Sequence, residues 1–222
     1  MRTEIPLFTV YNAPSVKEAV GKVIDSGFVG QGPVNDQFEI ALRHYLGVDY
    51  LNTVNSGTSA EHLAYHLLKK YGLEPGSEVL TTAYTCSATD VVIPANGFKI
   101  KWLDIDPRTL NIDYEDLERK INPNTKVINL VHFGGMPNDL DRIASIRKKT
   151  YEKFGFYPWV IEDAAHAFGA KYKGQHIGGH GNIVTFSFQA IKLLTSFDGG
   201  ALVSPGMEDF YRRGRLLRWF GL

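Results

Sequence analysis

The sequence is poor in cysteine and has no excess of charge of either sign. Cys86 is the single cysteine among 222 residues, so a disulfide framework within the chain is excluded, and a reducing cytoplasm is the simplest compartment to expect. Lysine and arginine together number 24, as do aspartate and glutamate, so nothing favours nucleic acid as a partner. No apolar run can span a bilayer, and the first residues lack the pattern of a signal peptide, so no membrane partner is expected either.

The usual metal-binding patterns are missing too. The sequence contains neither HExxH nor CxxC. His176 and His180 have the spacing of one helix face, but three glycines around them argue against a helix there. We therefore expect no metal site. Cys86 as a catalytic nucleophile stays an alternative, although the sequence identifies no histidine partner for it.

What the chain does contain is an alternation of short apolar runs with helical patterns. Hydrophobic residues make up 44%, enough for one large domain with its own core, and we assign 1–222 to it, with N-terminal helices inside 1–50. The expected strands are 50–54, 78–82, 99–103, 126–131, 159–161 and 183–188. The expected helices include 14–26, 35–46, 139–154, a short one capped by Asp113, and one near the C-terminal end. This order predicts an α/β fold of three layers, with a mostly parallel sheet covered on both faces.

The stretch 159–200 carries the most specific chemical signal. Glu162 and Asp163 follow the apolar run 159–161, and Lys192 follows the expected strand 183–188 in a largely apolar loop. A lysine amine becomes a useful nucleophile when desolvation or neighbouring charges lower its pKa. The pyridine nitrogen of pyridoxal phosphate needs an acidic partner to act as an electron sink. The pattern therefore fits pyridoxal phosphate, and the alternative is a helix-capping acid with a surface lysine.

A loop of small residues, NSGTSA at 55–60, suits the phosphate of such a cofactor. It lies between a strand and a helix, where free N–H groups and the helix dipole favour an anion. Gly57 permits close approach of the backbone, and the Thr58 hydroxyl can add a donor. Ser187 can bind the same phosphate while the following turn brings Lys192 back. The alternative for NSGTSA is an ordinary helix cap; it is not a P-loop, because GxxxxGK[ST] is missing.

Several polar residues fall at the carboxyl ends of the expected strands, where parallel sheets bind ligands. They are 55–58, 84–86, His132 and Asp163. His166 comes three residues after Asp163, so the two share a face if a helix begins here. A packing histidine is the alternative for His166.

Together these segments resemble the DegT/DnrJ/StrS family of sugar aminotransferases, which are fold type I enzymes of the aspartate aminotransferase superfamily. The resemblance runs in family order over almost the whole chain. Its matching segments are FVGQGPVNDQFE, NSGTSA, EVLTTAYTCSAT, WLDIDPRTLNID, VHFGGMPNDLD, EDAAHAFGA, and FSFQAIK with a later GG. The resemblance implies the large PLP-binding domain of that fold, with a seven-stranded sheet.

The resemblance also implies roles for individual residues. Lys192 would bond to the cofactor aldehyde and move the proton of the amino-acid α-carbon. Asp163 would pair with the pyridine nitrogen, and His166 would contact the ring or its 3-oxygen. The phosphate would be held by Gly57, Thr58 and Ser187. The implied reaction transfers an amino group from an amino acid, L-glutamate by resemblance, to a nucleotide-linked keto-sugar, in a homodimer.

Two departures from the family keep alternatives open. The position that usually stacks an aromatic side chain on the ring falls at Cys86, with Tyr84 as a candidate to replace it. Family members also continue into a smaller C-terminal domain, and we expect the 222 residues to lack it. The chain is then a fragment of a longer aminotransferase, or a catalytically inactive PLP-binding or assembly protein. A sugar dehydratase or a lyase is a further alternative, but the dehydratase branch carries histidine where Lys192 stands. A hydrolase that does not use PLP is a more distant one.

Overall fold

The computed structural model describes residues 6, 8–204 and 206–221. Its helices are α1 (Val16–Ser26), α2 (Pro33–Leu46), α3 (Gly57–Leu68), α4 (Ser87–Ala95), α5 (Tyr114–Lys120), α6 (Leu140–Phe154) and α7 (Glu208–Leu217), with short 3-10 turns at Lys69–Tyr71 and Phe133–Gly135. Its strands are β1 (Leu51–Val54), β2 (Glu78–Thr82), β3 (Lys99–Leu103), β4 (Thr125–Val131), β5 (Trp159–Asp163), β6 (Lys171–Tyr172), β7 (Gln175–His176), β8 (Ile183–Ser187) and β9 (Gly200–Val203). None of the described helices is long and apolar enough to cross a membrane.

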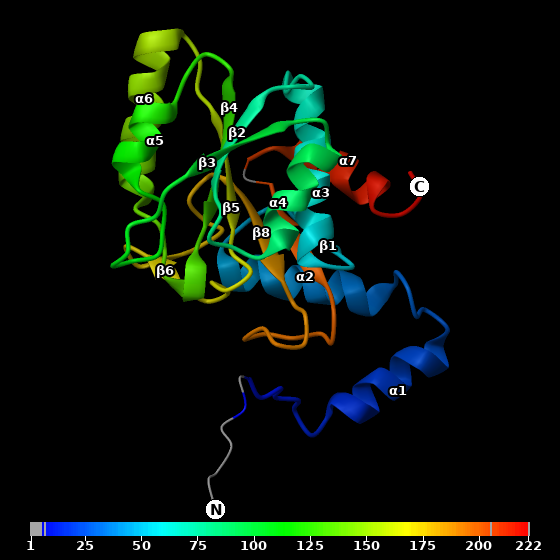
Figure 1. The fold of residues 1–222 in the computed structure, drawn as a ribbon. Coiled ribbons are helices and arrows are strands. Elements are labelled where there is room, and N and C mark those ends of the chain that lie inside the picture. The colour runs from blue at the N-terminus through cyan, green and yellow to red at the C-terminus, as the bar shows by residue number, and fades with distance from the viewer. Residues whose placement is uncertain (1–5, 7, 205, 222) are drawn as a thin grey trace, which may run out of the picture.

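Seven strands form one sheet in the order β1-β9-β8-β5-β4-β2-β3, and β6 and β7 form a separate hairpin. The five strands from β8 to β3 run parallel, whereas β9 pairs antiparallel with both β1 and β8. Because the parallel strands share one direction, their carboxyl ends meet at one edge of the sheet, in the lower part of Figure 1. The expected α/β class with a mostly parallel sheet is confirmed.

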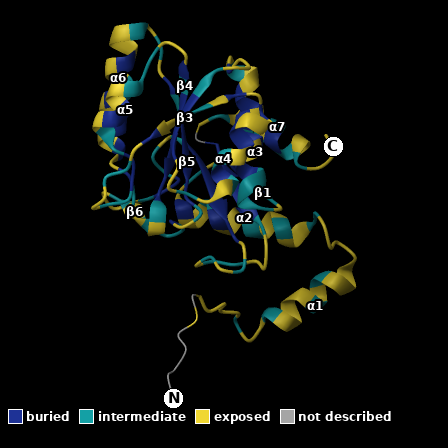
Figure 2. Cartoon of the chain, in the orientation of Figure 1, coloured by how far each residue is buried: buried dark blue, intermediate teal, exposed yellow. Residues whose placement is uncertain are grey.

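Helices cover both faces of this sheet, and each face has its own core. On β4 and β5, Ile128 and Val160 pack with buried residues of α2, α5 and α6, whereas the adjacent Val127 and Ile161 pack with α3, α4 and α7. This alternation is the two-residue period of a strand buried on both sides. Each such side chain stabilises the fold by about 1.5–3 kcal/mol when fully buried. Figure 2 shows the buried strands between their helices.

Several helix ends agree with the sequence. The Asp113 side chain accepts hydrogen bonds from the amides of Glu115 and Asp116, which confirms the predicted cap of α5. Asp139 accepts from Arg142 at the start of α6, and Ser56 accepts from Ser59 at the start of α3. Each cap of this kind contributes about 1 kcal/mol.

One local prediction is wrong, and the condition attached to another is not met. Glu162 and Asp163 lie inside β5 and do not follow it, because their backbones pair with β4 and β8. After them the chain turns and forms no helix, so His166 shares no helix face with Asp163. The cause is local: Asp163 Oδ1 accepts the amide of Ala165, and the amide of Ala164 donates to Thr185 of β8. An aspartate that bonds its own backbone two residues on favours a turn over a helix.

The helix α1 forms as its apolar spacing predicts, but it buries none of its residues. In Figure 1 it stands away from the sheet and its covering helices. Val20 and Ile24 on this helix, and Phe28 and Val29 just after it, are all exposed large hydrophobic residues. This segment therefore presents an apolar surface that the described part of the chain does not cover.

Candidate active site

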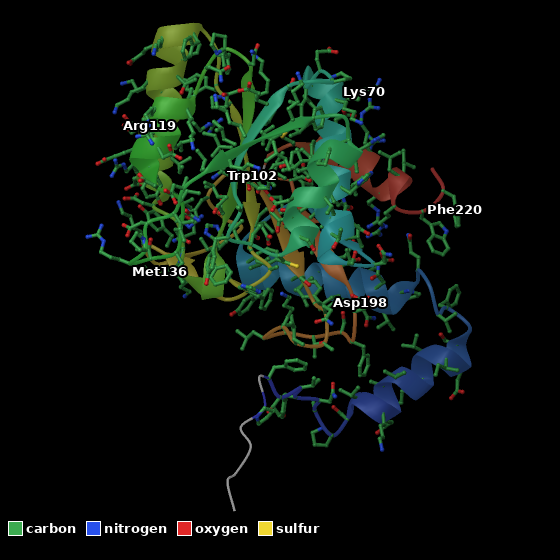
Figure 3. The ribbon with its side chains drawn as sticks, viewed as in Figure 1. Lys70, Trp102, Arg119, Met136, Asp198 and Phe220 are labelled. Atoms are coloured by element: carbon green, nitrogen blue, oxygen red, sulfur yellow. The ribbon has the colours of Figure 1, made fainter. Side chains whose placement is uncertain are left out.

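A cavity of about 320 Å³ opens at the carboxyl edge of the sheet. The ends of β4, β5 and β8, the starts of α3 and α4, and the loop between β8 and β9 contribute to its wall. Figure 3 shows Asp198 of that loop and Met136 after β4 near the lower end of the sheet, above α1. All seven predicted site residues line the cavity, namely Gly57, Thr58, Cys86, Asp163, His166, Ser187 and Lys192. The structure thus brings together residues that are up to 135 positions apart in the sequence, from Gly57 to Lys192 (192 − 57).

Asp163 lines this cavity, and both of its carboxyl oxygens accept hydrogen bonds. It is 9% exposed. Its Oδ2 accepts the Thr89 hydroxyl at 2.6 Å and its Oδ1 accepts the Ala165 amide at 2.9 Å. These two hydrogen bonds fix the orientation of the carboxyl group. A fixed carboxylate of this kind is suited to bind a protonated ring nitrogen.

The start of α3 lies unusually close to the end of β8. A Cβ on Gly57 would stand 2.9 Å from the Cβ of Ser187, and a Cβ on Gly200 would stand 2.4 Å from the Ser56 carbonyl oxygen. Only glycine fits at these two positions. The first turn of a helix leaves N–H groups without intrahelical partners. The close packing therefore brings those amides, the Thr58 hydroxyl and the Ser187 hydroxyl to one small region that suits a phosphate.

Lys192 and His166 line the same cavity, Lys192 from the loop after β8. Burial lowers the pKa of His166, the positive charge of Lys192 lowers it further, and Asp163 acts in the opposite direction. The Gly134 amide lies 3.4 Å from His166 Nδ1 and donates to it, so the ring can be neutral with its proton on Nε2. His166 also packs edge-on against Phe133, with ring centroids 5.6 Å apart.

A second pair of polar side chains, His132 and Glu162, is buried at the ends of β4 and β5. His132 Nε2 and Glu162 Oε2 are 2.7 Å apart and both side chains are fully buried. The Asn138 amide donates to His132 Nδ1, so the ring proton lies on Nε2 and points at Glu162. Asn182 donates to the other oxygen of Glu162 at 2.6 Å. These contacts tie the ends of β4 and β5 to the residue that precedes β8.

Cys86 lies in the cavity wall, and the phenyl ring that lines the cavity among the described residues belongs to Phe186 of β8. Cys86 is exposed and precedes α4. Tyr84 does not line the cavity and instead packs against Phe133 with ring centroids 4.4 Å apart. The suggestion that Tyr84 replaces the family's stacking residue therefore has no support in this geometry.

Sequence reasoning missed two acids close to Asp163. Glu61 lines the cavity from α3 and is 3% exposed, and Asp90 lies on α4. Burial raises the pKa of Asp90 to about 6, with a further contribution from Asp163. Burial likewise raises the pKa of Glu61 well above its ordinary value, with Asp163 and Asp90 adding to it. The sequence feature that could have identified Glu61 is an acidic residue on an otherwise apolar face of the helix.

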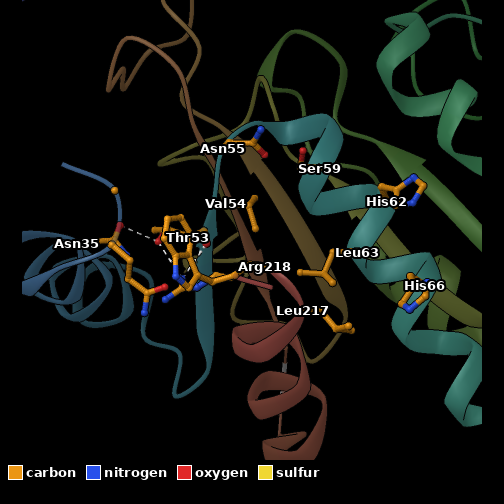
Figure 4. A pocket seen from close by; sticks show the side chains of 13 residues that line it. Asn35, Thr53, Val54, Asn55, Ser59, His62, Leu63, His66, Leu217 and Arg218 are labelled. Carbon is orange, nitrogen blue, oxygen red and sulfur yellow. Dashed lines mark hydrogen bonds between the residues drawn. The ribbon is translucent and has the colours of Figure 1, made fainter. Parts of the chain in front are cut away.

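A separate hollow of about 640 Å³ lies on the other side of the α3 start, next to α7 (Figure 4). Asn35, Thr53 and Arg218 meet at its edge: the Thr53 hydroxyl donates to Asn35, and Arg218 donates to the Thr53 carbonyl at 2.8 Å. It holds no acid–lysine constellation comparable to that of the cavity above. Within the described residues, no cluster of three or more metal-ligating side chains occurs.

Comparison with known proteins identifies the family of the chain. The family model of the DegT/DnrJ/EryC1/StrS aminotransferases matches residues 12–222. The uncharacterized protein MJ1066 of Methanocaldococcus jannaschii is 37% identical over 209 residues, which cover 93% of this chain and 52% of that protein. This chain therefore spans about half the length of that curated relative.

Two solved structures are similar in fold and sequence. The sugar aminotransferase CalS13 of Micromonospora echinospora has a TM-score of 0.92 and 42% identity, covering 98% of this chain and 58% of that one. Spr1654 of Streptococcus pneumoniae, in its PLP-form, has a TM-score of 0.89 and 29% identity, covering 97% of this chain and 58% of that one. With the family model matching most of its length, this chain belongs to the DegT/DnrJ/EryC1/StrS aminotransferase family.

Proposed function

We propose that residues 1–222 form the PLP-binding large domain of a cytoplasmic aminotransferase. The observation that carries the proposal is the meeting of Lys192, Asp163 and the start of α3 in one cavity. Membership of the family and likeness to a sugar aminotransferase support a sugar substrate. We take the acceptor to be a nucleotide-linked keto-sugar and the donor to be L-glutamate.

The residues present fit pyridoxal phosphate. Hydrogen bonds from Thr89 and Ala165 hold the Asp163 carboxyl group in place, and this group suits the ring nitrogen as a partner. Gly57 and Gly200 leave room for the backbone approach that a phosphate needs, because a side chain at either position would collide with its neighbour. The cavity of about 320 Å³ is in the range of small-cofactor sites.

When bound, pyridoxal phosphate supplies an electron sink for the carbon that loses its proton. The chain contributes the groups around it. Lys192 holds the aldehyde and then moves the proton at the amino-acid α-carbon. Asp163 keeps the ring nitrogen protonated, while Thr58 and Ser187 donate to the phosphate.

His166 acts beside the ring as a neutral donor in this proposal. Its lowered pKa keeps it uncharged near Lys192, so it adds no second positive charge to the cavity. A neutral imidazole can still donate a hydrogen bond to the 3-oxygen of the ring. The buried His132–Glu162 pair holds the strand ends that carry these groups.

A homodimer is part of the proposal, since α1 and the segment after it expose apolar residues. Val20, Ile24, Phe28 and Val29 lie along one N-terminal segment without a covering element in the described chain. A second copy would bury them. Size-exclusion chromatography with light scattering measures this directly, and a monomer at micromolar concentration would contradict it.

The proposed reaction is tested with the half-reaction. The protein, loaded with pyridoxal phosphate, is mixed with L-glutamate, and the pyridoxamine form and 2-oxoglutarate are measured. Equal amounts of both products support the aminotransferase. Retained cofactor without either product supports an inactive PLP-binding or assembly protein. In a second mixture that also contains a nucleotide-linked keto-sugar, loss of a sugar hydroxyl without transfer of nitrogen to the sugar supports a dehydratase.

A further inference from the structure

Glu61 is a buried acid that the proposed reaction does not yet use. It lies on the inward face of α3 and lines the cavity together with Asp163 and Lys192. Its side chain is 3% exposed, and neither of its carboxyl oxygens has a hydrogen-bond partner within the described residues. A buried carboxylate without donors or a cation is very unfavourable.

The groups around Glu61 offer it no positive charge. From β5 and α4 the titratable neighbours are Asp163, Asp90 and Cys86, and each makes ionisation of Glu61 harder. From α3 itself the neighbour is Tyr65, whose pKa is raised by burial and then by Glu61. Lys192 and His166 line the same cavity, but among the described residues no salt bridge reaches Glu61.

The floor beneath Glu61 contains further polar groups without partners. The Tyr65 hydroxyl and both amide atoms of Asn129 are buried and unpartnered in the described structure. Asn129 lies on β4, next to β5 and Asp163. Buried groups of this kind are normally satisfied by ordered water or by a ligand. Of these groups, Asn129 acts on Glu61 by favouring its charged form, but this effect is smaller than that of burial.

Asp163 and Glu61 differ in the hydrogen bonds that their carboxyl oxygens accept. Asp163 accepts two, from Thr89 and Ala165, whereas no partner of Glu61 meets hydrogen-bond geometry in the described residues, and Asn129 is the nearby side chain that favours its charged form. Hydrogen bonds to the charged form favour ionisation, and burial without them favours the neutral acid. Burial therefore favours the neutral form of Glu61, with Asp163 acting in the same direction.

We propose that Glu61 is the proton-bearing partner of Asp163, and that the pair presents a single negative charge to the ring nitrogen of pyridoxal phosphate. The proposal rests on the function proposed above. Glu61 acts through Asp163 and is a positioning residue in this role. It keeps a proton taken from solvent on its own carboxyl, so that one carboxylate faces one protonated nitrogen.

The proposal is tested by following the Glu61 carboxyl itself. The protein is labelled with glutamate carrying 13C at the side-chain carboxyl, and the Glu61 signal is identified by its loss in Glu61→Gln. We expect this signal to titrate well above the pH at which an exposed glutamate does, which is about 4.3. We expect its midpoint to fall in Asp163→Asn and on addition of pyridoxal phosphate, because one change removes a negative neighbour and the other adds a positive one.

Inorganic phosphate is the matched control, since it can occupy the phosphate region without bringing a ring nitrogen. It should not lower the Glu61 midpoint, because it adds negative charge and no positive charge. A signal that titrates in the ordinary range, or one that ignores both Asp163→Asn and pyridoxal phosphate, overturns the proposal. Covalent attachment of the cofactor to Lys192 is measured on the same samples. Its absence points to failure of the proposed function, whereas attachment with an unresponsive Glu61 rejects only the acid pair.

Discussion

The close contact between Gly57 and Ser187 predicts a large effect for a small change. Gly57→Ala would place a Cβ 2.9 Å from the Ser187 Cβ and 3.4 Å from its Cα and Oγ. Carbon atoms pack best at about 3.5–4.0 Å, so α3 and β8 must separate by roughly 0.5–1 Å. Overpacking of this kind costs about 1–3 kcal/mol. At roughly 2–4 °C per kcal/mol for a domain of this size, Tm should fall by about 2–12 °C.

The same displacement moves the amides and hydroxyls proposed to bind the phosphate. Misplacement of binding groups by about 1 Å can reduce an activity about 100-fold. We expect the Kd for pyridoxal phosphate to rise by about 10- to 100-fold, which corresponds to roughly 1.4–2.8 kcal/mol. Absorbance titration measures this Kd, and differential scanning calorimetry measures Tm.

A double-mutant cycle isolates the contact. Ser187→Gly removes the Cβ and Oγ that the new methyl group would meet, so Gly57→Ala should cost much less stability in that background. Gly21→Ala on the exposed helix α1 is the control, because a Cβ there meets nothing within 4 Å. It should leave Tm unchanged or raise it slightly. An equal loss of stability from Gly57→Ala in both backgrounds would refute the packing argument.

Three other substitutions test the surroundings of the site. Asp90 has a pKa of about 6 against an ordinary 3.8, so the stability it contributes is fully present below about pH 4 and is lost as pH rises through 6. The full effect of this pKa shift is reduced by about half because Asp90 is partly exposed. As the pH rises from 4 to 7.5, the unfolding free energy of Asp90→Asn should therefore increase by about 1–1.5 kcal/mol relative to that of the wild type. Urea unfolding at both pH values measures this difference, and a difference that does not change with pH would contradict the pKa shift. Gly200→Ala should cost about 3 kcal/mol or more, because its Cβ would meet the backbone of Ser56 and Gly57, and a near-normal urea midpoint would show that β9 can move away. Glu162→Gln should cost about 3–5 kcal/mol, since both its oxygens accept buried hydrogen bonds, and a loss below 1 kcal/mol would mean that the network adapts.

The sequence was sufficient to predict the architecture and seven of the residues that line the cavity. Periodicity predicted β2 and β3 with their observed bounds, because their apolar residues alternate with turn signals on both sides. The convergence of Asp163 and Ser187 followed from a general property of parallel sheets, whose strand ends face one edge. Such inferences depend on local pattern and topology, which one sequence contains.

The sequence alone did not predict the features that depend on contacts between distant segments of the chain. The turn after Asp163 depends on side-chain bonding that competes with a helix at 164–167. The partners of Asp163 and the isolation of Glu61 depend on how α3 and α4 pack on the sheet. Likewise, the spacing of α1 predicts its helix correctly, but not that the helix finds no surface to pack on within the described chain.

The most direct test of the account is to find which lysine binds the cofactor. The purified chain is incubated with pyridoxal phosphate, reduced with borohydride, digested, and analysed by mass spectrometry, with Lys192→Ala treated in parallel. The account predicts one cofactor per chain on the peptide that contains Lys192, and no comparable label in the variant. Label spread over surface lysines, with Lys192 unmodified, would contradict the central claim that this cavity is built around Lys192 and Asp163.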